Sequence, residues 1–240
     1  MLVSASQPYF APFPGLFSKA HLSDVFVLLD EVQFPRGATW VSRNRFKNHL
    51  GALWMSIPVH RKGLGLQRIN RVRIQREGSW ERKHLESLET AYAHAPYFSE
   101  HRDLVREMFS GKFERLVDLN LTVIRYLMRH LDIDTEVELL SQLGIEATGD
   151  RRLIAICRKL GANRFLAQAP ARKYLDADLF AREGIALEFF QPPSPVYPQL
   201  WGEFIPNLSA LDLLFNCGPK SRDILLGRYA RGNPNPPAGE

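Results

Sequence analysis

The amino-acid sequence predicts an α/β fold with a mostly parallel sheet, built from two βαβ-like units. Near the N-terminus, two short apolar runs at 2–6 and 25–29 flank a helical stretch at 16–22, which is the pattern of a strand, a helix and a strand. Helix and strand patterns alternate again from residue 150 onward. Alternation at such short spacing favours parallel pairing, so the sheet is expected to be Rossmann-like.

The other expected elements follow from the same patterns. Two further short strands are expected at 53–59 and 71–74, and Pro58 lies near the end of the first. The second unit begins with a helix at 150–160, where Gly161 takes the position of a C-terminal glycine cap. It continues with a strand at 164–168, a helix at 176–183, a strand at 185–190 and a closing helix at 209–215.

The middle of the chain, at about 79–131, is expected to be a helical insert. Apolar side chains recur there at helical spacing in three stretches, with one stop at Pro96 and another at Gly111. The simplest interpretation is that these helices cover the sheet or one another. We expect residues 1–231 to form a single domain and residues 232–240, rich in Pro, Gly and Asn, to form a flexible tail.

Composition bounds the class of protein. Of the 240 residues, 45% are hydrophobic, which is enough for a packed core. The net charge of +5 is a mild positive excess that fits an anionic small-molecule substrate. Proteins whose main ligand is nucleic acid usually carry a concentrated basic stripe instead. Two cysteines are too few for a disulfide framework. Since neither a signal peptide nor an apolar run of about 18 residues is evident, we expect a cytoplasmic protein with no membrane span.

Three loops follow predicted strands and carry polar or aromatic side chains. They lie at 7–15, 30–47 and 169–174. Parallel strands end at the same edge of a sheet, and ligands bind at the carboxyl ends of such strands. We therefore predict that four side chains converge on one cavity, with Asp30 and Tyr174 in catalytic roles and the other two in substrate binding. The four are Gln7, Asp30, Arg45 and Tyr174.

The second of these loops carries an alternating basic pattern. Arg43, Arg45 and Lys47 occupy every other position, so in an extended segment they project from one face. Three adjacent cations suit a phosphate or diphosphate, which arginine binds with paired hydrogen bonds. The alternative is a solvated edge strand whose charges discourage aggregation.

Asp30 ends an apolar strand, where an unpaired carboxylate is costly. It could bind a sugar hydroxyl, a cation or an amine, or act as a general base, and we expect Arg45 to fold back over it and balance its charge. A purely structural bridge to an arginine is the alternative. Nearby, Gln33 and Asn44 are candidates to bind hydroxyl or amide groups of a substrate, because neither side chain titrates.

A proline-rich segment at 193–202 supplies two more candidate substrate-binding side chains, Tyr197 and Gln199. Three prolines make this segment stiff and non-helical. It could form an aromatic wall for a sugar or a base, or a well-packed lid over the core. Of the two cysteines, Cys157 lies on the apolar face of its predicted helix and is interpreted as a core residue.

Several familiar signatures are absent from the sequence. The histidines show no metal-ligand spacing, and the GxGxxG, GxxxxGK[ST] and GxSxG motifs do not occur. The sequence therefore indicates no particular metal or cofactor, and it does not support a dinucleotide-binding, P-loop or hydrolase assignment.

Longer motifs along the chain resemble the WbqC-like protein family. In the N-terminal part they are QPYFAPFPGLF at 7–17, SDVFVLLDEVQF at 23–34 and RNRFK at 43–47. In the C-terminal part they are ICRKLGA at 156–162, KYLD at 173–176, VYPQLWGEF at 196–204 and LSALDLLFNCGP at 208–219. Several long motifs in the right order span nearly the whole chain, which makes the resemblance specific.

The resemblance implies a place in bacterial surface-polysaccharide biosynthesis, such as that of O-antigen, or in related pathways. By that association we expect an enzyme, a transferase or amide-forming ligase, that moves an acyl or aminoacyl group onto an amine such as that of a nucleotide-activated amino sugar. An acyl carrier or an aminoacyl donor would then be a partner. Two alternatives are a non-catalytic scaffold protein of a biosynthetic assembly and an ATP-dependent amide ligase. The second rests on a distant similarity to nucleotidylyltransferase-type α/β enzymes, whose HxGH motif is absent here.

Overall fold

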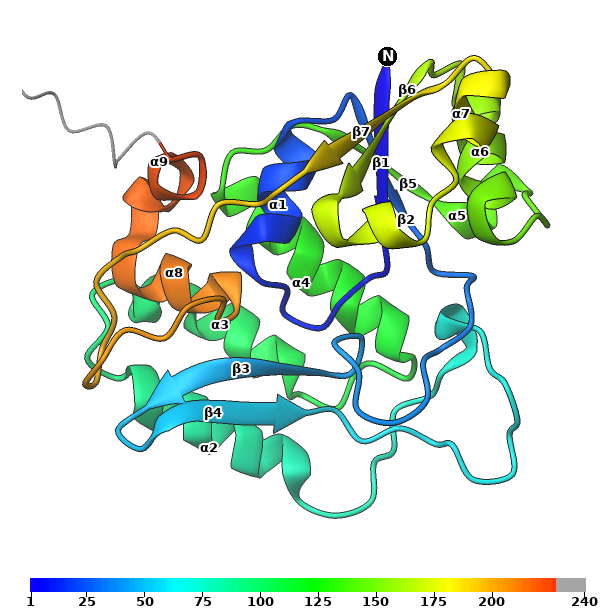
Figure 1. The fold of residues 1–240 in the computed structure, drawn as a ribbon. Helices are drawn as coiled ribbons and strands as arrows, with labels where there is room; N and C mark the ends of the chain where they lie inside the picture. The colour runs from blue at the N-terminus through cyan, green and yellow to red at the C-terminus, as the bar shows by residue number, and fades with distance from the viewer. Residues whose placement is uncertain (228–240) are drawn as a thin grey trace, which may run out of the picture.

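A computed structural model describes residues 1–227 and confirms the α/β fold (Figure 1). The main sheet is parallel throughout, in the order β5-β2-β1-β6-β7. Its strands are β1 Leu2–Ser6, β2 Val25–Leu28, β5 Glu136–Leu139, β6 Arg164–Gln168 and β7 Ala186–Phe190. The tail predicted at 232–240 lies outside the described residues.

The N-terminal βαβ unit forms as expected. Helix α1, Pro14–His21, begins with a proline whose missing N–H costs nothing in the first turn. The two strands pair in parallel, and Ser6 of β1 lies opposite Leu28 of β2. All four residues of β2 are buried, as in a strand that is covered on both faces.

The strand order places a topological switch point at the centre of the sheet. From β1 the chain moves outward through β2 to β5, and it then returns to the other side of β1 to form β6 and β7. The pairing of β1 with β6 ends at Ser4 and Leu166, although β1 continues to Ser6 and β6 to Gln168. Open α/β sheets bind ligands outside the carboxyl ends of the strands at such a point.

A hairpin and three helices make up the middle of the chain. Strands β3, Arg43–Asn48, and β4, Gly51–Ser56, pair in antiparallel fashion. Helices α2 Trp80–Tyr92, α3 Phe98–Met108 and α4 Leu116–His130 confirm the helical stretches. In Figure 1 the hairpin lies below the carboxyl edge of the main sheet, with α2 under it.

The strand predicted at 71–74 is wrong. The chain instead forms the short 3-10 helix η1, Ile69–Arg71, followed by single bridges. Arg73 bridges to Arg115 and Ile74 bridges to Val59, so the two neighbours pair with different segments and no continuous ladder forms. Alternating apolar residues there predicted a strand. Such a pattern does not show whether neighbouring residues will pair with one segment or with two.

The remaining elements surround the sheet. Strand β5 was not predicted, because it is a short edge strand with glutamates at Glu136 and Glu138. The other elements are α5 Leu140–Leu143, α6 Gly149–Leu160, η2 Ala169–Lys173, α7 Ala177–Arg182, α8 Ala210–Cys217, η3 Gly218–Lys220 and α9 Ser221–Leu225. Within the described residues, no helix is long and apolar enough to cross a membrane.

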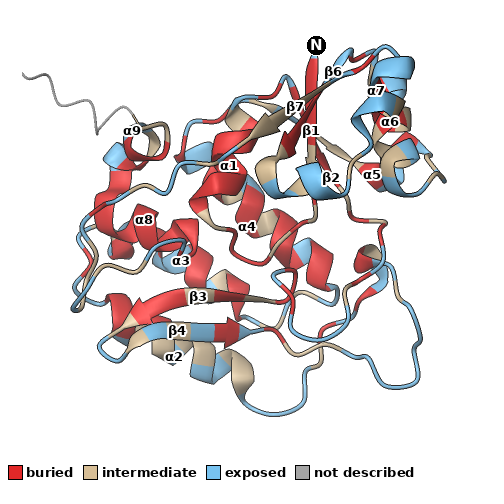
Figure 2. Cartoon of the chain, in the orientation of Figure 1, coloured by how far each residue is buried: buried red, intermediate tan, exposed pale blue. Residues whose placement is uncertain are grey.

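A buried polar cluster joins α8 to the hairpin and α2. Helix α8 is buried along its whole length, as Figure 2 shows in red. Asp212 of α8 is fully buried and accepts hydrogen bonds from the hydroxyls of Tyr92, at 2.6 Å, and Tyr197, at 2.9 Å. Burial raises the pKa of Asp212, and the two tyrosine hydrogen bonds and nearby Lys47 oppose that shift. We call Asp212, Tyr92, Tyr197 and Lys47 the Asp212 cluster.

Both cysteines are buried. Cys157 is completely buried on α6, which confirms it as a core residue. Burial raises the pKa of the Cys157 and Cys217 thiols to about 11. Since the thiolate is the nucleophilic form, neither side chain is suited to covalent catalysis near neutral pH.

Candidate functional site

The loop that leaves β1 is fixed to the hairpin layer. The side-chain nitrogen of Asn44 donates to the carbonyls of Phe10, at 3.0 Å, and Ala11, at 2.6 Å. The backbone N–H of Phe10 donates to the carbonyl of Trp40 at 2.9 Å. These bonds tie the start of the hairpin to the loop that follows β1. Asn44 is only 1% exposed, so the structure gives it this scaffolding role in place of the predicted contact with substrate.

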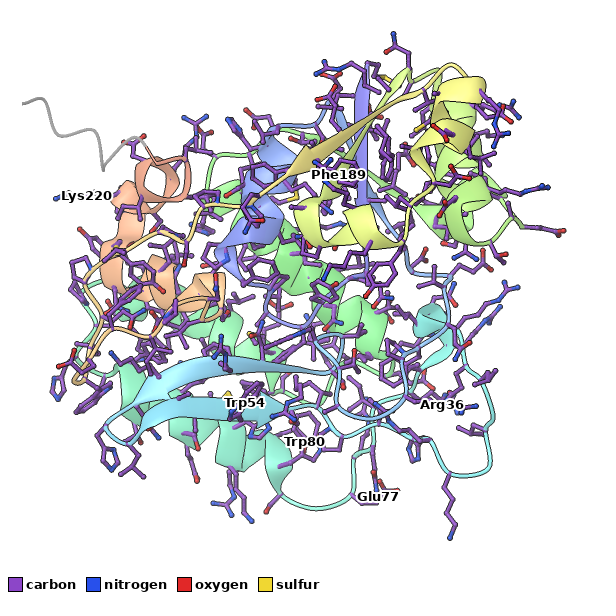
Figure 3. The ribbon with its side chains drawn as sticks, in the orientation of Figure 1. Arg36, Trp54, Glu77, Trp80, Phe189 and Lys220 are labelled. Carbon is purple, nitrogen blue, oxygen red and sulfur yellow. The ribbon has the colours of Figure 1, made fainter. Side chains whose placement is uncertain are left out.

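A pair of exposed tryptophans and a pair of arginines form one surface on the hairpin. Trp40 and Trp54 are 44% and 45% exposed, and their rings stack with centroids 5.7 Å apart. The guanidinium carbon of Arg43 lies 3.9 Å from the centroid of Trp54. That of Arg45 lies 5.7 Å from Trp54 and 5.9 Å from Trp40. We call these four residues the Trp–Arg platform; Figure 3 labels Trp54 on the hairpin.

Strand pairing explains why the platform forms. Arg45 lies directly opposite Trp54 in the β3–β4 ladder, so their side chains leave the same face, and Arg43 is two residues away on that face. Arg45 also donates from Nη2 to the carbonyls of Pro206 and Asn207, each at 3.2 Å. Within the described residues, the buried Nε atoms of Arg43 and Arg45 have no hydrogen-bond partner. The platform therefore combines flat apolar rings with two guanidinium groups.

Lys47 continues the alternation but does not join the platform. Its side chain is 2% exposed, and Nζ donates to Gln199 Oε1 at 3.2 Å and to the carbonyl of Glu203 at 2.6 Å. Burial lowers the pKa of Lys47, and the charges of Asp212 and Glu203 oppose the shift. The predicted site of three adjacent cations is therefore wrong, because the segment that contains Gln199 and Glu203 covers the end of β3.

Tyr197 and Gln199 are likewise used inside the protein. Tyr197 is 6% exposed and bonded to Asp212. Gln199 exchanges two hydrogen bonds with the backbone of Ile205, at 2.9 and 3.0 Å, besides accepting from Lys47. The geometry matches the packed lid, and neither side chain is available to a substrate as predicted.

Asp30 is a structural carboxylate. It is 3% exposed, and its two oxygens accept hydrogen bonds from the backbone N–H of Ser141, at 3.0 Å, and from the Ser141 hydroxyl, at 2.6 Å. These bonds tie the start of α5 to the end of β2. The expected pairing with Arg45 is wrong, because Ser141 follows the neighbouring strand β5 and takes that place. With both oxygens engaged and only 3% of the residue exposed, Asp30 is not available for the predicted catalytic role.

Gln7 and Tyr174 lie at the same edge of the sheet, as the parallel topology predicted. Gln7 directly follows β1, and Tyr174 follows β6 through η2. Tyr174 is 81% exposed, while Gln7 is half-buried. None of the four side chains predicted to share a cavity lines the cavity of about 670 Å³ at the ends of β2 and β5. Gln33 does line that cavity, at the ends of β2 and β5.

Lys19 is a buried cation that the sequence patterns did not single out. It lies on α1, is 3% exposed, and donates from Nζ to the carbonyl of Ala5 at 2.7 Å. Ala5 follows Ser4, where the pairing of β1 with β6 ends, so the lysine satisfies a carbonyl at the switch point. Burial lowers the pKa of Lys19 to about 8. A lysine in a short, otherwise mostly apolar helix between two buried strands was the available signal.

The lowered pKa of Lys19 predicts a rise in stability at alkaline pH. Between about pH 8 and 10.5 the unfolded chain holds the Lys19 proton more tightly than the folded chain, so the free energy of unfolding rises with pH. Relative to Lys19→Met, the native protein should gain about 2–3 kcal/mol between about pH 7 and about pH 10, measured by urea unfolding. Cys157 and Cys217 have the opposite effect on the pH dependence of stability. Because both proteins contain them, the difference between the two pH profiles removes their contribution. Parallel pH profiles for the two proteins would contradict the burial of this charge.

Comparison with known proteins gives one family. The model of the WbqC-like protein family matches residues 7–224. A relative from Mycobacterium tuberculosis, described as uncharacterized protein Rv1507c, is 30% identical over 232 residues, which cover 95% of this chain and 98% of the relative. No solved structure matches the chain.

Proposed function

The chain belongs to the WbqC-like protein family, and from that premise we propose that it binds a nucleotide-activated amino sugar on the Trp–Arg platform and transfers an acyl or aminoacyl group to the sugar's amine. One observation carries the binding part of this proposal. Arg43 and Arg45 both lie against the exposed ring of Trp54.

The platform offers what a nucleotide diphosphate needs. A base or a sugar ring can stack on an exposed indole, and this stacking does not depend on which hydrogen-bonding groups the base or sugar carries. The guanidinium groups of Arg43 and Arg45 can donate to phosphate oxygens, and arginine binds such oxygens in pairs. Arginine is also already held in place by the ring beneath it, so little side-chain entropy is lost when an anion binds.

The carboxyl edge of the main sheet supplies the side chains for the transfer step. The amine nitrogen forms a bond to the acyl carbon, the bond from that carbon to its carrier breaks, and the released carrier keeps the bonding electron pair and takes up the proton that the amine loses. In this proposal Gln7 orients the sugar through hydroxyl hydrogen bonds. Tyr174, exposed at the end of β6, contacts the reacting groups. Asp30 acts only by positioning α5 through Ser141.

A product assay tests the reaction. Incubation of the protein with UDP-, GDP- or dTDP-activated amino sugars and with acyl or aminoacyl donors should yield an amide, detected by mass spectrometry as a mass increase of the nucleotide sugar. The increase should disappear when the amine is blocked beforehand. Tight binding of a nucleotide sugar with no product from any donor would contradict the enzyme and favour the scaffold protein.

Trp54→Ala should weaken nucleotide-sugar binding by about 1–3 kcal/mol, roughly 5- to 150-fold, because it removes the ring against which both arginines lie. Isothermal titration measures the affinity. Leu50→Ala is the matched control, since Leu50 is 82% exposed on the same hairpin but does not belong to the platform. Equal affinities for Trp54→Ala and Leu50→Ala would argue against the platform as the binding surface.

A further inference from the structure

A cavity of about 670 Å³ lies at the carboxyl ends of β2 and β5, and no residue of the Trp–Arg platform lines it. Its volume is in the range of small-molecule sites, about 300–1,000 Å³. The lining residues are Glu31, Gln33, Leu66, Gln67, Arg68, Leu140, Gly144, Ile145, Glu146, Thr148 and Arg152. Its lining residues come from the end of β2, the segment that precedes η1, helix α5 and the chain from α5 into α6.

Two guanidinium groups meet at this cavity. Arg68 forms an ion pair with Glu31. Arg152, on α6, donates from Nε to the carbonyl of Ala147 at 2.8 Å, and among the described residues its terminal nitrogens have no hydrogen-bond partner. Burial lowers the pKa of Arg152, the charge of Arg68 lowers it further, and Glu31 opposes the shift. A partly desolvated cation beside a second cation is an arrangement that an added anion stabilises.

Apart from the carboxylate of Glu146, the rest of the lining suits the organic part of such an anion. Leu140, Ile145 and Leu66 offer apolar contact, while Gln33 and Thr148 offer hydrogen bonds. Thr148 precedes the first turn of α6 and makes no capping hydrogen bond with its side chain, so its hydroxyl is available. The anion-binding groups and the apolar side chains thus occupy one concave surface.

From this geometry we infer that the cavity is a second binding site, which takes a small organic molecule through its carboxylate or phosphate group. The oxyanion binds the terminal nitrogens of Arg152, with Arg68 and Thr148 beside it, and the remainder packs against Leu140 and Ile145. The inference does not depend on the function proposed for the platform, because the two surfaces share no residue.

Chemical-shift titrations of the ¹⁵N-labelled full chain test this site with two probes, inorganic phosphate and hexanoate. At least one probe should bind, shifting amide signals around Thr148 and Arg152. Arg152→Gln should weaken that binding roughly tenfold or more, the effect of losing a charged hydrogen bond. Preference for phosphate identifies a phosphate ligand, and preference for hexanoate identifies a carboxylate with an apolar chain.

Two further variants make the outcome decisive. Arg68→Gln serves if Arg152→Gln fails to fold, because the side chain of Arg68 is 62% exposed and should tolerate replacement; it too should weaken binding. Arg73→Gln is the matched control, since Arg73 is similarly exposed, is also ion-paired and does not line this cavity. Absence of binding by both probes, or equal binding by Arg73→Gln and the Arg152 and Arg68 variants, overturns the inference.

Discussion

Replacement of Asp212 by alanine is expected to lower the free energy of unfolding by about 3–5 kcal/mol, the range for breaking a buried, hydrogen-bonded charge network. Asp212 is fully buried and accepts from the hydroxyls of Tyr92 and Tyr197. Its charge also opposes the lowering of the Lys47 pKa that burial causes. The variant would therefore leave two hydroxyls without their acceptor and one ammonium without its nearby carboxylate.

Chemical denaturation measures this effect. Asp103→Ala is the control, because it deletes the same carboxylate from a side chain that is fully exposed and only weakly paired. It should change the free energy of unfolding by about 0.5 kcal/mol or less. A loss for Asp212→Ala that is no larger than that of the control would show that the Asp212 cluster does not hold α8 to the hairpin.

The double variant Arg43→Ala/Arg45→Ala is expected to weaken the binding of a nucleotide diphosphate by about 2–6 kcal/mol, or roughly 30-fold and more. Each arginine brings one cation to the platform, and both guanidinium groups lie against the ring of Trp54. Stability should change far less, by about 1–2 kcal/mol, because partly exposed cation–π contacts are weak.

Isothermal titration with UDP, for example, compares this variant with Arg102→Ala/Arg125→Ala. The control removes the same two charges from exposed positions on α3 and α4. It separates the local site from the general effect of net charge on anion binding. If both double variants lose affinity equally, the platform is not the site. A large loss of stability with unchanged binding would favour a structural role for the two arginines.

Local patterns were sufficient for most of the parallel sheet. The strands predicted at 2–6 and 164–168 match β1 and β6, and the helix at 150–160 differs from α6 by one residue. In these segments the periodicity, the caps and the buried face agree with one another. The parallel pairing of β1 and β2 then placed Gln7 at the carboxyl edge, where the topology rule required it.

The candidate site was less predictable because its side chains are selected by distant partners. Arg43, Arg45 and Lys47 look equivalent in the alternation, yet Lys47 is withdrawn by a segment more than 150 positions away. The carboxylate of Asp30 is occupied by hydrogen bonds from Ser141, which lies 111 positions along the chain. Spacing reports which face of a strand a side chain leaves, and it contains no information on what later covers that face.

The proposed binding surface can be observed directly through the indole N–H signals of the four tryptophans. Trp80 and Trp201 donate their indole N–H groups to the carbonyls of Gln75 and Ala91, each at 2.8 Å, and they lie off the platform. In a titration of ¹⁵N-labelled protein with a UDP-activated amino sugar, with signals assigned by Trp→Phe variants, the signals of Trp40 and Trp54 should shift together and saturably. Those of Trp80 and Trp201 should stay in place. Saturable binding that leaves the Trp40 and Trp54 signals unmoved would contradict the platform as the nucleotide-sugar site.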